Sequence, residues 1–140
     1  MSRKRIGLTA AGAAMLIAGL WALDAQQTSP NFTGTITRLK EDPPALITYI
    51  RFDPGARTKW HVHEKGQLML VEDGVALEQQ KGQPVREIHA GEAIWCPPGV
   101  AHWHGAAPNQ GGTQYNVTRG GITWLDPVTD AEYTATPVRK

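Results

Sequence analysis

Two pairs of histidines, about forty residues apart, are the residues of this chain best suited to metal chemistry. The first pair is His61 and His63, and the second is His102 and His104. Side chains at positions i and i+2 of an extended strand point to the same face, so each pair can aim both imidazoles at one point. Imidazole nitrogens bind zinc, copper, iron and nickel. Because four of the five histidines share this spacing, the sequence predicts one metal site formed by both pairs.

Gln67 lies four residues after the first pair and is a further candidate ligand. An amide oxygen can bind a metal but carries no charge, so this donor set would hold a divalent ion without an anionic protein ligand. Such a centre is a strong Lewis acid and lowers the pKa of a bound water or alcohol. The alternative is that Gln67 only forms a hydrogen bond to a histidine ligand.

The rest of the chain reads as short strands separated by turns, and no long helical periodicity interrupts it. Residues 46–52 alternate, which places Thr48, Ile50 and Phe52 on one face. Turns are expected at Gly74, at Gly82 and at the Pro-Pro-Gly of residues 97–99. Turns spaced by about 8–12 residues are typical of an all-β sandwich or barrel. The predicted strands cover residues 46–52, 67–72, 75–80, 85–89, 93–96, 101–105, 114–118 and 122–125.

Length and composition exclude several classes of function. A chain of 140 residues has room for one domain. Its single cysteine, Cys96, excludes an intrachain disulfide and a zinc site built from thiolates. The 14 basic and 13 acidic residues nearly cancel. Since no basic stripe follows any segment, we expect no nucleic-acid partner.

The first 25 residues have the pattern of an export signal. Basic residues 3–5 precede an uncharged stretch at residues 6–23 that is rich in alanine, glycine and leucine. An uncleaved membrane anchor, or a buried helix, is the alternative. We therefore expect a signal or anchor helix at 1–25, a linker at 26–31 and the folded domain at 32–140. The domain would be exported to the periplasm or anchored facing it, and would touch the membrane only through this segment if uncleaved.

The spacing of the histidines and glycines resembles the two motifs of the cupin family. The first motif is carried by Gly55, His61, His63, Gln67 and Gly74, and the second by Gly91, Pro97, Gly99 and His102. The resemblance implies a single-domain jelly-roll barrel with the metal inside. Two positions depart from the cupin pattern. Gln67 replaces the usual glutamate of the first motif, and Ala106 replaces the asparagine that closes the second.

Within the cupins, the chain resembles small bacterial proteins with manganese-dependent hydroxynitrile lyase activity. The similar segments run from Phe32 to Tyr133, and the most specific is the stretch at residues 102–108. The resemblance implies a divalent metal, with manganese preferred over iron, zinc, nickel or copper. It implies His61, His63, Gln67 and His102 as ligands, His104 facing the substrate, and Thr48, Ile50 and Thr118 lining the pocket. Gln114 shares strand parity with Thr118 and is expected beside it.

The implied reaction cleaves or forms the carbon–carbon bond of a cyanohydrin, with an aldehyde as product or substrate. His104 would be the catalytic base because its pKa suits proton transfer near neutrality, or else a fourth ligand. A dioxygenase acting on a small enol or aromatic compound is the main alternative. A barrel that binds a small ligand without catalysis is another. Cupins of this type pair through strands, so a homodimer or homotetramer is expected.

Overall fold

The computed structural model describes residues 29–41 and 47–139. The predicted export or anchor helix at residues 1–25 lies outside the described residues, as does Leu46. Among the described residues, no helix is long and apolar enough to cross a membrane. Helix α1 (Asp130–Tyr133) consists of a single turn.

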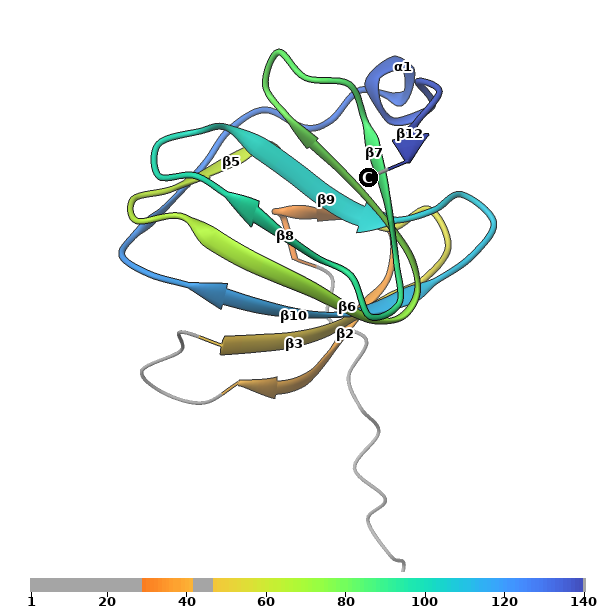
Figure 1. The fold of residues 1–140 in the computed structure, drawn as a ribbon, viewed down its shortest axis with the longest axis horizontal. Coiled ribbons are helices and arrows are strands. Elements are labelled where there is room, and N and C mark those ends of the chain that lie inside the picture. The colour runs from red at the N-terminus through yellow and green to blue at the C-terminus, as the bar shows by residue number, and fades with distance from the viewer. Residues whose placement is uncertain (1–28, 42–46, 140) are drawn as a thin grey trace, which may run out of the picture.

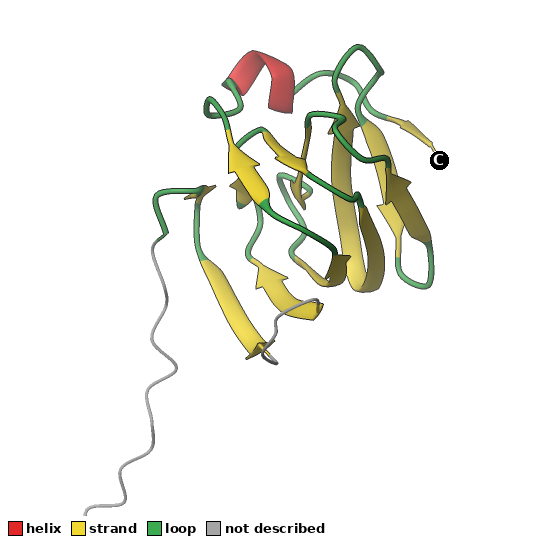
Figure 2. Cartoon of the chain, turned by 90° about the vertical axis from the view of Figure 1, so that its left-hand side faces the viewer, coloured by secondary structure: helices red, strands yellow, loops and turns green. Residues whose placement is uncertain are grey.

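In the described part of the chain, twelve strands form two hydrogen-bonded sheets that share one long strand and curve around a common interior (Figures 1 and 2). This arrangement is an all-β, nearly closed jelly-roll barrel, as the sequence predicted. The first sheet has the order β2 (Ile36–Glu41), β3 (Ile47–Phe52), β10 (Gly112–Thr118), β6 (Gln67–Gln80) and β8 (Ala93–Cys96). The second has the order β1 (Phe32–Thr33), β4 (Arg57–Thr58), β9 (His102–Ala106), β6, β7 (Arg86–His89) and β12 (Val138–Arg139). Strand β5 (His61–His63) lies between β9 and β11 (Ile122–Trp124).

Gly74 lies inside the shared strand, so the turn predicted there is wrong. The first part of β6 pairs with β10 and β8, whereas the part after Gly74 pairs with β7 and β9. Gly74 has φ of +75°, and a Cβ atom there would lie 2.0 Å from the carbonyl oxygen of Gly111. Glycine therefore lets β6 bend from one sheet into the other while its partner strand stays close. The turns predicted at Gly82 and at residues 97–99 are confirmed.

The barrel interior is apolar around the middle and polar at the metal-binding motifs. In β6, Met69 and Val71 point inward and are buried, while Leu68 and Leu70 point outward. Ile50 and Phe52 of β3 are likewise buried, which confirms the predicted face. Among these apolar side chains lie all four paired histidines and Gln67, each at most 3% exposed. Buried polar groups need partners, so their contacts indicate what this end of the barrel is built to hold.

Candidate metal centre

The pairing of β5 with β9 brings the two histidine pairs together. His61 lies directly opposite His102 in this antiparallel ladder, and the centroids of their rings are 4.3 Å apart. His63 and His104 follow on the same faces of the two strands, as period-2 geometry requires. Each strand thus contributes two imidazoles to one side of the barrel wall.

Three of these imidazoles present ring nitrogens to one another. The candidate ligand atoms of His61, His102 and His104 all lie within 4.8 Å of each other. The Nδ1 of His61 is 2.9 Å from the carbonyl oxygen of Lys59, and a carbonyl oxygen only accepts, so this Nδ1 carries the proton. The Nε2 of a neutral His61 then has a free lone pair. This is the form of imidazole that binds a metal.

Gln114 fixes the same tautomer in His104. Its side-chain nitrogen donates to the carbonyl oxygen of Gly105 at 3.0 Å, which turns its Oε1 toward His104. That oxygen lies 2.8 Å from Nδ1 of His104 and accepts its proton. The Nε2 of His104 therefore keeps its lone pair. The sequence placed Gln114 in the pocket, but it lies fully buried behind His104 and does not line the cavity.

The contacts of His102 provide a test of whether a cation fits here. Its Nε2 is 2.8 Å from Oε1 of Gln67, and its Nδ1 is 3.3 Å from the carbonyl oxygen of Val100. A neutral imidazole has only one N–H, so with Gln67 Oε1 facing Nε2 neither tautomer satisfies both contacts. A cation bound by Nε2 and by the Gln67 oxygen satisfies them, and so does a turn of the amide that lets its nitrogen donate to Nε2. The contact matches both predicted roles of Gln67, a direct ligand and a partner of a histidine ligand.

His63 provides a second, independent sign of a missing partner. Neither of its ring nitrogens has a hydrogen-bond partner among the described residues, although the side chain is buried. Its ring centroid lies 5.0 Å from that of His61 and 5.4 Å from that of His102. Orphaned polar atoms of this kind are costly unless an ion or water satisfies them. A divalent ion would satisfy one of these two nitrogens, although His63 lies outside the group of three histidines whose ligand atoms are within 4.8 Å of one another.

Burial keeps the whole cluster neutral. Desolvation, the largest cause, lowers the pKa of His104 to about 3 and that of His102 to about 4. It also lowers the pKa of His63, and that of His61 well below its ordinary value. Neighbouring imidazoles add to the effect for His61, His102 and His104. At neutral pH all four rings are therefore neutral, each with one N–H and one free lone pair, and metal binding would not have to displace the second proton of an imidazolium.

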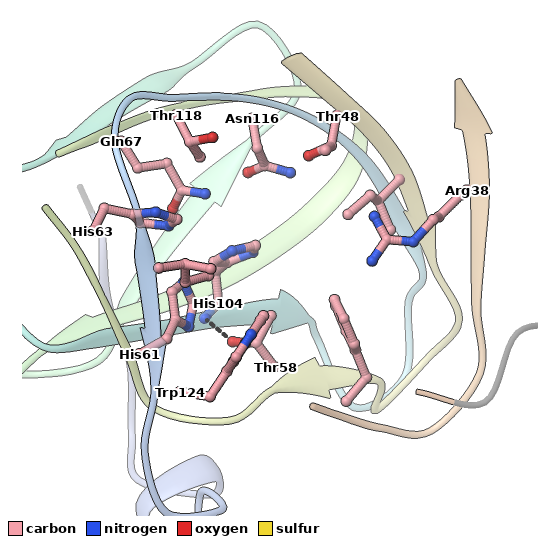
Figure 3. A pocket seen from close by; sticks show the side chains of 14 residues that line it. Arg38, Thr48, Thr58, His61, His63, Gln67, His104, Asn116, Thr118 and Trp124 are labelled. Atoms are coloured by element: carbon pink, nitrogen blue, oxygen red, sulfur yellow. Dashed lines mark hydrogen bonds between the residues drawn. The ribbon is translucent and has the colours of Figure 1, made fainter. Parts of the chain in front are cut away.

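A cavity of about 230 Å³ opens beside the cluster (Figure 3). His61, His63, Gln67 and His104 form one end of it, and three predicted pocket residues, Thr48, Ile50 and Thr118, also line it. The volume lies below the roughly 300–1,000 Å³ of pockets for drug-sized ligands, so the site suits a small molecule. Asn116, which shares strand parity with Gln114 and Thr118, lines it as well. Sequence reasoning did not assign the other lining residues, which are Phe32, Arg38, Thr58, Gly120, Ile122 and Trp124.

Two of these residues support the cluster directly. Thr58 accepts a hydrogen bond from the backbone N–H of His104 at 3.1 Å. Trp124 packs against His61 with ring centroids 4.9 Å apart, because β11 pairs with β5 at this register. Asn116 lies on the same face as Thr118, as strand parity predicts. Trp124 depends on a long-range pairing that no local pattern reveals.

Comparison with known proteins agrees with this geometry. Residues 48–115 match the family described as Cupin domain. Over 111 residues, the chain is 42% identical to the (R)-mandelonitrile lyase of Granulicella tundricola. The aligned region covers 73% of this chain and 85% of that protein. The chain belongs to the cupin family. Its three-histidine cluster is compatible with the divalent metal of a cupin.

Solved structures show the same fold. A cupin-like protein from Thermotoga maritima is 34% identical and superimposes with a TM-score of 0.71, covering 78% of this cupin and 90% of that chain. The polyketide cyclase RemF from Streptomyces resistomycificus is 22% identical with a TM-score of 0.55, over 74% of this chain and 75% of its own. At that identity the likeness shows the fold alone.

Proposed function

We propose that this cupin is a metal-dependent lyase of the hydroxynitrile lyase type, which cleaves or forms the carbon–carbon bond of a cyanohydrin. The observation that carries the proposal is a cluster of neutral, buried imidazoles opening onto a small cavity. The relative named (R)-mandelonitrile lyase supports the same reaction class. An uncharged donor set also favours acting on an oxygen ligand over storing an oxidised metal.

The proposed metal ligands are His61, His63, Gln67 and His102, and the proposed ion is manganese. The unpartnered ring of His63 and the contact between Gln67 and His102 both support this set. Iron, zinc, nickel and copper also accept such donors. A bound divalent ion would lower the pKa of a substrate hydroxyl at this end of the cavity.

In this proposal His104 moves the proton. Its Nε2 lone pair is free because Gln114 holds the proton on Nδ1. As the substrate O–H bond breaks, its proton passes to Nε2 and a C=O bond forms. The electron pair of the C–CN bond leaves with cyanide, and the imidazolium then returns the proton to the leaving group. Burial lowers the pKa of His104 to about 3, so the expectation of a pKa near neutrality is wrong. The neutral ring is a weaker base than expected, whereas its imidazolium returns the proton readily.

His104 as a fourth ligand remains the alternative, and its place in the 4.8 Å group is what favours it. The two roles predict different behaviour in a His104→Ala variant. A base variant keeps its metal and loses turnover, whereas a ligand variant loses both. Metal content measured on the same preparation as the rate distinguishes the two.

The experiment that tests the function joins metal analysis to an anaerobic assay. Wild-type protein should contain close to one manganese per chain and release benzaldehyde from mandelonitrile without oxygen. The His63→Ala variant should lose both, while His89→Ala, the one histidine outside the cluster, should lose neither. Turnover that requires oxygen would favour the dioxygenase. Bound metal without any turnover would favour a binding protein.

Export to the periplasm and assembly into a homodimer or homotetramer are also proposals. The chemistry of the N-terminal 25 residues supports export, and the resemblance to other cupins supports assembly. Mass spectrometry of the N-terminus after expression in a bacterial host would show whether this segment is removed. Light scattering on purified protein would give the number of chains.

A further inference from the structure

Arg38 lines the cavity at the end away from the imidazoles. Figure 3 shows the histidines and Gln67 on one side, Arg38 on the other, and Thr48 and Asn116 along the wall between them. Arg38 reaches this position because it shares a strand face with Ile36, which is buried in the core. It lies opposite Ile50 in the β2–β3 ladder.

The wall next to Arg38 carries an amide without a partner. Asn116 is 2% exposed, lines the cavity, and neither its Nδ2 nor its Oδ1 has a hydrogen-bond partner among the described residues. It lies directly opposite Thr48 in the β3–β10 ladder, which sets a hydroxyl beside the amide. Buried amides are almost always satisfied, so this group indicates that a ligand completes it.

The charged group on the described part of the cavity wall is a guanidinium. Arg38 is the only charged group among the described residues that line the cavity, and none of them is Asp or Glu. A divalent ion at the other end would add further positive charge. In a small, partly desolvated site, positive charge of this kind favours an anionic ligand.

We propose that this cavity takes a substrate with a carboxylate, which Arg38 binds while Asn116 and Thr48 donate to it. This inference rests on the proposed function for the reacting end of the substrate, and it names the class: small hydroxy or carbonyl compounds with a carboxylate at the far end. A guanidinium matches a carboxylate with two parallel hydrogen bonds. A phosphate would call for more donors than one arginine, one amide and one hydroxyl.

A structural role for Arg38 must be separated from this one. Strand β2 is the edge of its sheet, and charges that point inward on an edge strand protect it from pairing with other chains. Arg38 also lies over the ring of Phe32, with its guanidinium carbon 5.8 Å from the centroid. Either role predicts lost stability or aggregation on substitution, but neither predicts discrimination between a charged and an uncharged ligand.

The test compares two nearly isosteric ligands in metal-loaded protein. Calorimetry would measure the affinity of 4-(hydroxymethyl)benzoate and of 4-(hydroxymethyl)benzamide, together with their 3-substituted isomers. We expect wild-type protein to prefer the carboxylate by tenfold or more, the usual size of a charged hydrogen bond. Arg38→Gln should bring the ratio close to one. Arg51→Gln removes the same charge from the exposed side of the neighbouring strand β3, and it should leave the ratio unchanged.

Other outcomes overturn the inference. It fails if wild-type protein binds acid and amide equally, binds none of the four compounds, or keeps its preference in Arg38→Gln. If Arg38→Gln does not fold, Asn116→Asp replaces it, since a carboxylate on the cavity wall should repel the acid and spare the amide. Mandelonitrile cleavage is scored separately. If the protein prefers the carboxylate but does not cleave mandelonitrile, the proposed lyase activity is refuted and the carboxylate subsite is supported. If it cleaves mandelonitrile but shows no preference, the lyase activity is supported and the subsite is refuted.

Discussion

Replacing Gln114 with methionine tests the idea that this residue orients His104. Methionine has a similar length but cannot accept from Nδ1 of His104 or donate to Gly105. His104 and Gly105 are both buried, and a buried polar group left without its hydrogen-bond partner costs about 1–3 kcal/mol. We therefore expect the variant to lose about 2–6 kcal/mol of the free energy of unfolding, a large part of the stability of a small domain.

Gln79→Met is the matched control. Gln79 makes the same two kinds of hydrogen bond, accepting from the indole N–H of Trp103 at 3.0 Å and donating to the carbonyl oxygen of Gln83 at 2.9 Å. Gln79 is only half-buried, so water can replace its bond to Gln83, but Trp103 is fully buried and its indole N–H would lose its acceptor. We expect this variant to lose about 1–3 kcal/mol, the cost of one orphaned buried group, against two such groups in Gln114→Met.

Urea unfolding of the metal-free proteins gives the comparison. With a slope of about 1–3 kcal/mol per molar urea, the midpoint of Gln114→Met should fall by about 1 M or more and that of Gln79→Met by about half as much. Nitrogen-15 NMR of the histidine rings adds a readout that stability does not give. His104 should carry its proton on Nδ1 in wild-type protein and lose this preference in Gln114→Met. Equal midpoint shifts, or an unchanged tautomer, would refute the reasoning.

Three further predictions follow from the same structure. Removing the metal with a chelator should lower the melting temperature, because an ion at a hundred times its dissociation constant stabilises by about 2.7 kcal/mol; added manganese should restore it, and an unchanged melting temperature would count against the site. Metal-free protein should lose stability as the pH falls from about 6.5 to about 4, because His102 of the unfolded chain binds a proton at a higher pH than His102 of the folded protein does. This imidazole alone accounts for a loss of about 3 kcal/mol in the free energy of unfolding. Urea midpoints measured at pH 7 and at pH 4.5 would show the loss. Gly74→Ala should destabilise far more than Gly82→Ala, since both have positive φ but only the Cβ at residue 74 would meet backbone, at 2.0 Å; equal melting temperatures would show that β6 does not need this glycine.

The alternation of the strands made most of the fold predictable, and its failures have local causes. The sequence prediction divided strand β6 in two, because a glycine after two acidic residues is typical of a turn. The strand is continuous because it pairs with segments far away in the chain, which a local pattern does not show. Strand β2 was missed because its two apolar residues, Ile36 and Leu39, lie three positions apart and show no alternation. Helix α1 had a readable signal, since Thr129 and Glu132 form a capping box, but one turn produces no periodicity.

Spacing alone placed the four histidines and Gln67 together, because period-2 geometry and two glycine-bounded hairpins leave few other arrangements. Spacing could not supply the partners of the ring nitrogens. The proton on Nδ1 of His61 depends on a carbonyl two residues away, and that on His104 depends on Gln114 across the barrel. These contacts decide which lone pairs are free, so the chemistry of the cluster required the structure.

Strand β10 shows why parity cannot distinguish the roles of residues on one face. Gln114, Asn116 and Thr118 all point inward, yet each lies at a different distance from the bulge between Thr113 and Gln114. Gln114 lies behind His104 and orients it. Asn116 lies on the cavity wall with no hydrogen-bond partner among the described residues, and Thr118 is half-buried beside Gln67. Substitutions at the three positions should therefore separate: position 114 changes the tautomer and stability, position 116 changes ligand binding, and position 118 changes the size of substrate admitted. If all three changed the same property to the same degree, depth along the strand would not be what assigns their roles.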